Sequence, residues 1–121
     1  VLVVDDSGPN RKICAKLMST HKHEVYEAQD GKHCLEVFDQ HVREGRRPFD
    51  LVLMDDNMPR MTGTQATAEL RDRNFPGLIF GVTGDLHKES VDRFIGNGAN
   101  QVLSKPLSID VLRNNINLIL S

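Results

Sequence analysis

Two apolar segments of the sequence each end in a pair of carboxylates, and these four acids are the first candidates for chemistry. VLVV is followed by Asp5 and Asp6, and LVLM is followed by Asp55 and Asp56. Acids that converge in one crevice repel one another and have raised pKa values unless a cation joins them. A few carboxylate oxygens suit Mg²⁺, which keeps several waters and shares its shell with phosphoryl groups. The pattern therefore predicts a Mg²⁺ site, in which Mn²⁺ can substitute because it favours the same oxygen ligands.

A hydroxyl and an amine follow two later apolar segments, Thr83 after LIFGV and Lys105 after QVLS. A metal-bound acid beside a lysine and a threonine suits phosphoryl transfer, because positive charge and hydrogen bonds stabilise the equatorial oxygens during in-line attack. No other nucleophile has an adjacent base, so an aspartate carboxylate that forms an acyl phosphate is the economical nucleophile. Each residue taken alone has a simpler interpretation, as a helix cap, a turn residue or a surface lysine.

Apolar runs alternate with helically periodic segments along the whole chain, which indicates repeated βα units. The first, third and fourth apolar runs are continuous, as in parallel strands covered on both faces, whereas the second alternates and the fifth is short. Right-handed crossovers then favour an α/β fold, a doubly wound, flavodoxin-like sheet of five parallel strands in the order 2-1-3-4-5 with helices on both faces. Strands are expected at 1–4, 24–28, 50–54, 78–82 and 101–103, and helices at about 9–20, 31–44, 63–73, 86–96 and 108–120.

This topology predicts that the candidate residues meet. In a doubly wound sheet the functional crevice lies beyond the carboxyl ends of the strands, where the strand order reverses. The crevice is here expected between the first and third strands, whose ends carry the two acidic pairs. The functional interpretation gains its weight because all the candidates fall at the same end of one sheet.

The composition narrows the class of protein. The chain has 121 residues, 39% hydrophobic, with a net charge of −2, which suits one domain without the basic field expected for nucleic acid or an anionic membrane. No apolar run approaches the roughly 20 residues that cross a bilayer, so a cytoplasmic location is expected. We also expect a monomer or weak dimer. Cys14 and Cys34 lack metal-ligand spacing and are expected to be buried, reduced thiols. The chain begins with VLVV and no Met, which suggests a domain, residues 1–121, excised from a longer protein.

Over essentially its whole length the sequence resembles the receiver domain of response regulators in two-component signalling. The motifs are weak singly but specific in this order and spacing: VLVVDD at 1–6, DLVLMDDNMPRMTG at 50–63, GVTG at 81–84 and GANQVLSKP at 98–106. The resemblance implies a phosphoacceptor that takes a phosphoryl group from a phosphohistidine on a histidine kinase or histidine phosphotransfer domain. Such a domain is not an enzyme, because it assists only its own phosphorylation and dephosphorylation, and its phosphorylation acts as a conformational switch.

The resemblance also implies roles for single residues. In the family the phosphoacceptor lies three residues before Met-Pro, and counting back from Met58 gives Asp55. The other implied roles are Mg²⁺ ligation by Asp5 (directly or through a water), Asp6, Asp55 and the backbone carbonyl of Asn57, phosphoryl contacts by Thr83 and Lys105, and a cis Lys105–Pro106 bond. Independently of the family, successive strand residues face opposite ways, so Asp55 and Asp56 cannot both face the crevice. Asp56 is expected to face solvent or a local turn hydrogen bond.

Some positions depart from the commonest family pattern. Val102 replaces the aromatic residue that commonly lies three positions before the lysine in receivers that drive output domains, which favours the receiver of a hybrid histidine kinase. A response regulator with a separate output domain is the alternative. Thr62 replaces the commoner Asp before Gly63 and is expected to cap the following helix. Asn57 and Asp85 occupy positions that tune phosphoryl lifetime in the family, and they predict a lifetime of minutes or less.

Three other interpretations compete with the phosphoacceptor. A phosphatase of the haloacid dehalogenase type would carry Asp-x-Asp after its first strand, where this chain has Asp5-Asp6-Ser7-Gly8. An FMN carrier of the same topology would need a first loop rich in hydroxyl and glycine residues and flanking aromatics, but the chain has no Trp and one Tyr. A degenerate receiver used only for protein binding would not need the complete set of acids, threonine and lysine.

Overall fold

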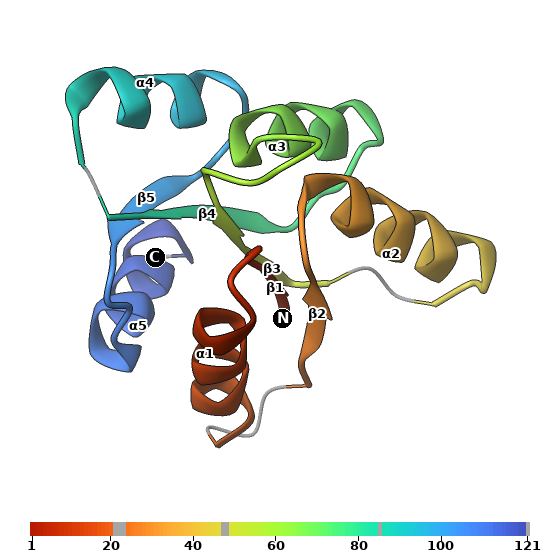
Figure 1. Cartoon of the computed structure of the whole chain (residues 1–121), viewed down its shortest axis with the longest axis horizontal. Helices are drawn as coiled ribbons and strands as arrows, with labels where there is room; N and C mark the ends of the chain where they lie inside the picture. The colour runs from red at the N-terminus through yellow and green to blue at the C-terminus, as the bar shows by residue number, and fades with distance from the viewer. Residues whose placement is uncertain (21–23, 47–48, 85, 121) are drawn as a thin grey trace.

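The computed structural model of the chain is a five-stranded parallel sheet between two layers of helices (Figure 1). The structure describes residues 1–20, 24–46, 49–84 and 86–120. In chain order the elements are β1 (Leu2–Val4), α1 (Gly8–Thr20), β2 (Tyr26–Ala28), α2 (Gly31–Arg43), β3 (Leu51–Asp55), α3 (Gly63–Asp72), β4 (Leu78–Thr83), α4 (Lys88–Gly96), β5 (Gln101–Ser104) and α5 (Ile109–Leu120). The predicted alternation of strands and helices is confirmed.

The strand order β2-β1-β3-β4-β5 confirms the predicted topology. All four neighbouring pairs are parallel. Every residue of β1 and β3 is buried, and so are the residues of β4 after its first, whereas the edge strands β2 and β5 are only partly buried. The continuously apolar strands are thus the ones that both helix layers cover. This pattern in the sequence distinguishes the central strands from the edge strands and so predicts the strand order.

The two faces of the sheet build two separate cores. Val52 and Met54 pack with residues of α2, α3 and α4, whereas Leu51 and Leu53 pack with residues of α1 and α5. Figure 1 shows the corresponding layers, with α1 and α5 on one side of the sheet and α2, α3 and α4 on the other. Because strand residues alternate between faces, Asp55 continues the series of Leu51 and Leu53 and faces the α1/α5 side.

β3, β4 and β5 each end one residue later than the sequence predicted, whereas β1 and β2 end where predicted. The extra residues of β3 and β4 are functional candidates. β3 includes Asp55, which pairs with Val82 of β4, and β4 includes Thr83, which pairs with Ser104 of β5. The prediction ended both strands one residue earlier because a polar residue after an apolar run is typical of a turn. Backbone pairing therefore holds the functional side chains more firmly than loop residues would be held.

Local hydrogen bonds explain where helices begin. The Thr62 side chain accepts the Gln65 N–H at 3.2 Å, and the Gln65 side chain accepts the Thr62 N–H at 3.0 Å, so the predicted cap of α3 is a capping box. The Ser108 hydroxyl accepts the Val111 N–H at 3.2 Å, which caps α5. None of the described helices has the length and apolar character needed to span a bilayer.

Both cysteines are free thiols, as predicted. Cys34 is fully buried, and burial raises its pKa to about 12. Cys14 is only half-buried, so the prediction of burial is right for one thiol and partly right for the other. Burial also raises the pKa of Cys14 to about 11, which keeps it in the unreactive thiol form at neutral pH.

Gly63 lies where α3 approaches the end of β3. Its N–H donates to the Asp56 carbonyl at 2.9 Å, and a Cβ at this position would overlap the carbonyl oxygen of Asp55. Neither the strand end nor the capped helix can move away without losing its hydrogen bonds. The requirement for glycine here is therefore a requirement of close backbone approach rather than of unusual torsion angles.

We expect Gly63→Ala to destabilise the fold by about 1–3 kcal/mol, because the added methyl group forces the end of β3 and the start of α3 apart. Gly96→Ala is the matched control, since a Cβ at Gly96 in α4 meets nothing within 4 Å. The control is expected to be neutral or slightly stabilising. Urea denaturation of both variants measures the difference, and equal stabilities would contradict the proposed close packing.

Candidate functional site

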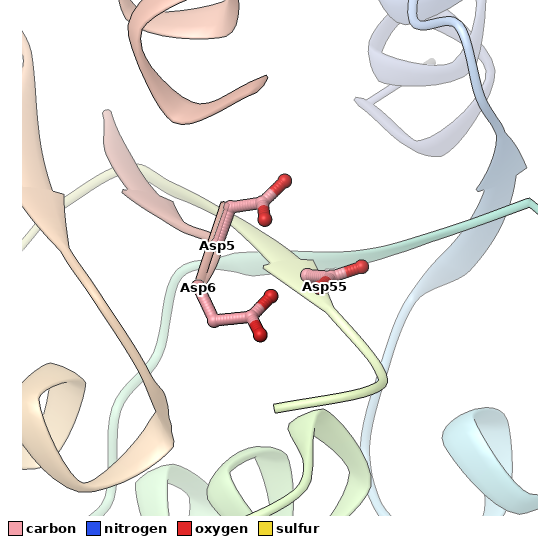
Figure 2. Close-up of side chains that lie close together, drawn as sticks. All are labelled: Asp5, Asp6 and Asp55. Carbon is pink, nitrogen blue, oxygen red and sulfur yellow. The ribbon is translucent and has the colours of Figure 1, made fainter. Parts of the chain in front are cut away.

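Three carboxylates from two neighbouring strand ends converge at the carboxyl edge of the sheet. Asp5 and Asp6 follow β1 and Asp55 ends β3, and one oxygen of each lies within 4.8 Å of the others. Figure 2 shows the three side chains pointing into a shared space. Asp5 and Asp55 are each only 7% exposed, whereas Asp6 is exposed. The sequence-predicted acidic cluster therefore exists, and its members differ in access to water.

Lys105 comes from the loop after β5 and binds this cluster. Its Nζ donates to Asp55 Oδ1 at 2.7 Å and lies 3.6 Å from Asp5 Oδ2. Burial alone would lower the pKa of Lys105, but the hydrogen bond to Asp55 and the charges of Asp55 and Asp5 raise it above its ordinary value. Lys105 is therefore a permanent cation at neutral pH that lies against two acids.

Asp55 is destabilised as an anion although it has this partner. Burial raises its pKa above the ordinary value of 3.8, and the charges of Asp5 and Asp6 add to the effect. The Lys105 hydrogen bond and charge offset the rise only in part. One ammonium is thus too little positive charge for three acids, and a divalent cation would satisfy the excess. The donor set, carboxylate oxygens without nitrogen or sulfur, fits Mg²⁺ or Mn²⁺.

Backbone contacts orient Asp5. Its Oδ1 accepts the Ser7 N–H at 2.9 Å, and its own carbonyl accepts Arg11 Nη1 at 2.9 Å. The N–H of Asp5 extends the β1–β2 pairing by donating to Ala28 at 3.1 Å. With Oδ1 occupied in this way, Oδ2 is the oxygen that faces Lys105.

The structure brings Thr83 to the same edge at the end of β4. The residue is 7% exposed, and its carbonyl accepts the Lys105 N–H at 2.8 Å. This bond ties the backbone of the lysine to the strand that carries the threonine. The Lys105–Pro106 peptide is cis, as predicted.

The two residues that follow Asp55 differ from it. Asp56 Oδ1 accepts the Thr64 hydroxyl at 3.3 Å, and the Asp56 carbonyl accepts the Gly63 N–H, which confirms the predicted local turn bond. Asn57 is exposed in the loop that leads to α3. Asp85, the other residue expected to tune phosphoryl lifetime, lies outside the described residues.

Sequence reasoning missed a cavity that adjoins the acids. It measures about 350 Å³ and opens beside Asp55 and Lys105, between α1 and the loop that joins β5 to α5. Residues outside the predicted site that line it include Asn10, Ile13, Cys14, Pro106 and Leu107. Ile13 on this wall is 69% exposed, and this exposure of an apolar side chain is visible only in the folded structure.

Asp55 makes the stability of the metal-free protein depend on pH. The pKa of Asp55 in the folded protein lies above 3.8, so protonation of Asp55 favours the folded state. This contribution to stability is fully present below pH 3.8 and is lost as pH rises through the folded pKa. At pH 7 without Mg²⁺, Asp55→Asn is therefore expected to raise Tm by a few degrees, and the gain should shrink toward pH 4. Thermal unfolding in EDTA from pH 4 to 7.5 measures this.

Asp56→Asn is the matched control for that experiment, because it removes one acid outside the cluster and should change Tm little at any pH. Mg²⁺ should stabilise the parent protein more than the Asp55→Asn variant, since a ligand stabilises the state that binds it. A gain that does not vary with pH, or a parent protein more stable than Asp55→Asn at pH 7, would contradict the assigned repulsion.

Comparison with known proteins identifies the family. Residues 1–117 match the family model of the response regulator receiver domain. The chain is 32% identical over 117 residues to the autoinducer 2 sensor kinase/phosphatase LuxQ of Vibrio vulnificus (strain YJ016), which covers 96% of this chain but 13% of that protein. It is 40% identical over 114 residues to the two-component response regulator ORR41 of Oryza sativa subsp. japonica, covering 93% of this chain and 87% of that protein.

A solved structure gives the same result. The chemotaxis protein CheY4 of Vibrio cholerae superposes with a TM-score of 0.84 at 26% identity, covering 98% of this chain and 95% of that chain. The relatives thus include both sensor kinases, of which this chain spans a small part, and response regulators. They give no support to a phosphatase of the haloacid dehalogenase type. The chain therefore belongs to the response regulator receiver domains, the phosphoacceptor modules of two-component phosphorelays.

Proposed function

We propose that Asp55 is the residue that accepts the phosphoryl group and that Asp5, Asp6, Asp55 and the Asn57 carbonyl hold Mg²⁺. The observation that supports both proposals is the convergence of three carboxylates within 4.8 Å, with the Lys105 ammonium 2.7 Å from Asp55. One lysine does not balance the negative charge of three carboxylates. Such a cluster can bind a divalent cation, and the bound cation can then attract a phosphoryl group.

The contacts of the four acids favour Asp55 as nucleophile. Asp5 has one oxygen committed to the Ser7 N–H, and Asp56 bonds to Thr64 away from the cluster. Asp6 is exposed, so water competes for its oxygens. Asp55 is held by strand pairing, is shielded from water and has a cation within hydrogen-bond distance. A fixed, partly desolvated carboxylate is the better nucleophile for in-line attack.

In the proposed reaction an Asp55 oxygen attacks the phosphorus of a phosphohistidine on the partner protein. An O–P bond forms as the N–P bond breaks, and the protonated phosphoimidazole leaves as neutral imidazole. Asp5, Asp6, Asp55 and the Asn57 carbonyl would hold Mg²⁺, which would supply positive charge to the carboxylates and to the transferred oxygens. Asp55 loses its charge on becoming an acyl phosphate, so Lys105 exchanges the carboxylate for a phosphoryl oxygen. The Thr83 hydroxyl donates a hydrogen bond to a second phosphoryl oxygen.

The cavity beside the cluster gives the donor a route. It joins Asp55 and Lys105 to an apolar wall from α1 and the β5–α5 loop, so a partner can bury side chains there while its histidine reaches Asp55. The exposed Ile13 lies on the same wall. Apolar contacts at this wall would provide affinity for the partner protein, while the reaction takes place at the polar end of the cavity, at Asp55 and Lys105.

We further propose that the domain is the receiver of a hybrid sensor histidine kinase and relays its phosphoryl group. Similarity to LuxQ supports this role, and so does Val102, which is 8% exposed and packs into the core beneath α2, α3 and α4. A valine lacks the large ring that could move between two positions on phosphorylation. The second candidate, a response regulator with separate output, is favoured by the similarity to ORR41 over most of that protein's length.

The assignment of the nucleophile predicts opposite outcomes for two adjacent substitutions. Asp55→Asn should abolish labelling by acetyl phosphate and Mg²⁺, because the amide cannot form the acyl phosphate, whereas Asp56→Asn should keep most of it. Intact-mass spectrometry measures the added phosphoryl group, and EDTA should prevent its addition to the parent protein. Normal labelling of the Asp55→Asn protein would refute the assignment.

The relay role predicts rapid loss of the phosphoryl group to a second carrier. Phosphorylated protein mixed with a histidine phosphotransfer domain should transfer the label within minutes and should stay monomeric in size-exclusion chromatography with light scattering. A phosphorylated form that is stable for hours, does not transfer its phosphoryl group to phosphotransfer domains and dimerises would instead support a response regulator with a separate output domain.

A further inference from the structure

Another ion pair joins the loop after Asp55 to the start of helix α2. Arg60 Nε donates to Asp30 Oδ2 at 2.8 Å, and Arg60 Nη2 donates to Asp30 Oδ1 at 2.9 Å. Asp30 is the N-cap of α2, and its Oδ1 also accepts the His33 N–H at 2.8 Å. The Asp30 side chain is 5% exposed. A bidentate pair with one buried partner is stronger than ordinary surface ion pairs.

Both partners hold their charged forms. The Arg60 hydrogen bonds hold the pKa of Asp30 below its usual range, with help from the His33 N–H. The hydrogen bond to Asp30 raises the pKa of Arg60. Both members of the pair are therefore charged over the whole physiological range of pH.

Arg60 also has an unusual backbone. Its φ is 64°, and Met61 N–H donates to the Pro59 carbonyl at 2.7 Å, which makes Arg60 the centre of a three-residue turn. Apart from Asn, Asp and His, residues with a Cβ rarely adopt positive φ unless their surroundings support it. Arg60 is not one of these residues, and its two bonds to Asp30 are side-chain contacts that support the turn beside the Met61 N–H bond.

The turn lies within the loop that carries the proposed metal ligand. This loop, residues 56–62, contains Asn57 and is fixed at its base by the Gly63 N–H to the Asp56 carbonyl. Met58 packs into the core. At the far side Gly31, the first residue of α2, approaches Met61 so closely that an added Cβ would lie 3.0 Å from the Met61 carbonyl oxygen. The loop is therefore held against the start of α2 by an ion pair and by close packing.

We propose that the Asp30–Arg60 pair is a positioning clamp for the loop 56–62, which sets the orientation of the Asn57 carbonyl and so the affinity of the site for Mg²⁺. The pair makes no contact with the acidic cluster and acts through the backbone. The inference rests on the proposed function, in which Mg²⁺ binds at Asp5, Asp6, Asp55 and the Asn57 carbonyl. Ligand orientation by outer contacts is a general requirement of metal sites.

Single substitutions separate this role from simple electrostatics. Arg60→Asn replaces the guanidinium side chain by that of Asn, a residue that adopts positive φ readily. Asp30→Asn removes the negative charge but keeps a side-chain oxygen that can accept the His33 N–H. If the pair acted only through its charges, losing Arg60 would strengthen Mg²⁺ binding and losing Asp30 would weaken it. A positioning clamp predicts that both substitutions weaken binding, by about tenfold. The double variant should be no weaker than the weaker single variant, because the pair acts as a unit.

Isothermal titration with MgCl₂ measures the affinities, and Arg73→Asn is the matched control. Arg73 pairs with Asp39 at 3.1 Å, which also joins the α3 region to α2 but lies away from the loop. The control should bind Mg²⁺ like the parent protein. Tighter or unchanged binding by Arg60→Asn, or equal weakening by Arg73→Asn, would overturn the clamp.

Amide hydrogen exchange of the metal-free protein tests the clamp without Mg²⁺. Protection of the Gly63 N–H should fall about tenfold in Arg60→Asn and stay unchanged in Arg73→Asn, because only the first releases the loop. If the parent protein binds no Mg²⁺, the proposed function fails, and the exchange result alone decides the inference. Unchanged Gly63 protection in Arg60→Asn would then refute it.

Discussion

The fold places more negative charge at one edge of the sheet than one lysine can neutralise, and the other features of the site depend on this constraint. Parallel strands deliver their carboxyl ends to the same edge, so Asp5, Asp6 and Asp55 meet without any loop having to bend toward them. The Lys105 ammonium lies 2.7 Å from Asp55 and still leaves the pKa of that acid raised. This repulsion lowers the stability of the site, and in the proposed function the same excess of negative charge would favour a bound cation and then a phosphoryl group.

The alternation of strand residues decides which of the two acids, Asp55 or Asp56, faces the acidic cluster. Leu51, Leu53 and Asp55 lie on one face of β3, so a shift of one residue in register would exchange Asp55 for Asp56. Two constraints prevent that shift: the pairing of Asp55 with Val82, and the close approach of Gly63 to the Asp55 backbone. The position of Asp55 in the acidic cluster therefore depends on packing several residues away from it.

Much of this arrangement could be predicted from the sequence, because it depends on patterns that a single chain displays. Continuous apolar runs marked the buried strands, and the spacing to Met58 singled out Asp55. The cavity beside α1 could not be predicted, since it depends on how far two packed elements stand apart. The Asp30–Arg60 pair was also out of reach, because 30 residues separate its members and each resembles an ordinary surface residue in sequence. Periodicity reports which face a residue occupies, but not which distant side chain it contacts there.

The Asp30–Arg60 and Asp55–Lys105 pairs show how different surroundings give the same kind of contact two roles. Asp30 is an isolated acid with two donors from Arg60 and one from a helix N-terminus, so both charges are stabilised and the pair stays closed. Asp55 shares one lysine with neighbouring acids, so its ionised form remains unfavourable and its pair with Lys105 is ready to exchange. A guanidinium fork suits the permanent contact, whereas the single ammonium of a lysine can move from a carboxylate to a phosphoryl oxygen without breaking a fixed geometry. The fixed pair holds the loop in place, and the exchangeable pair lies where the chemistry changes the charge.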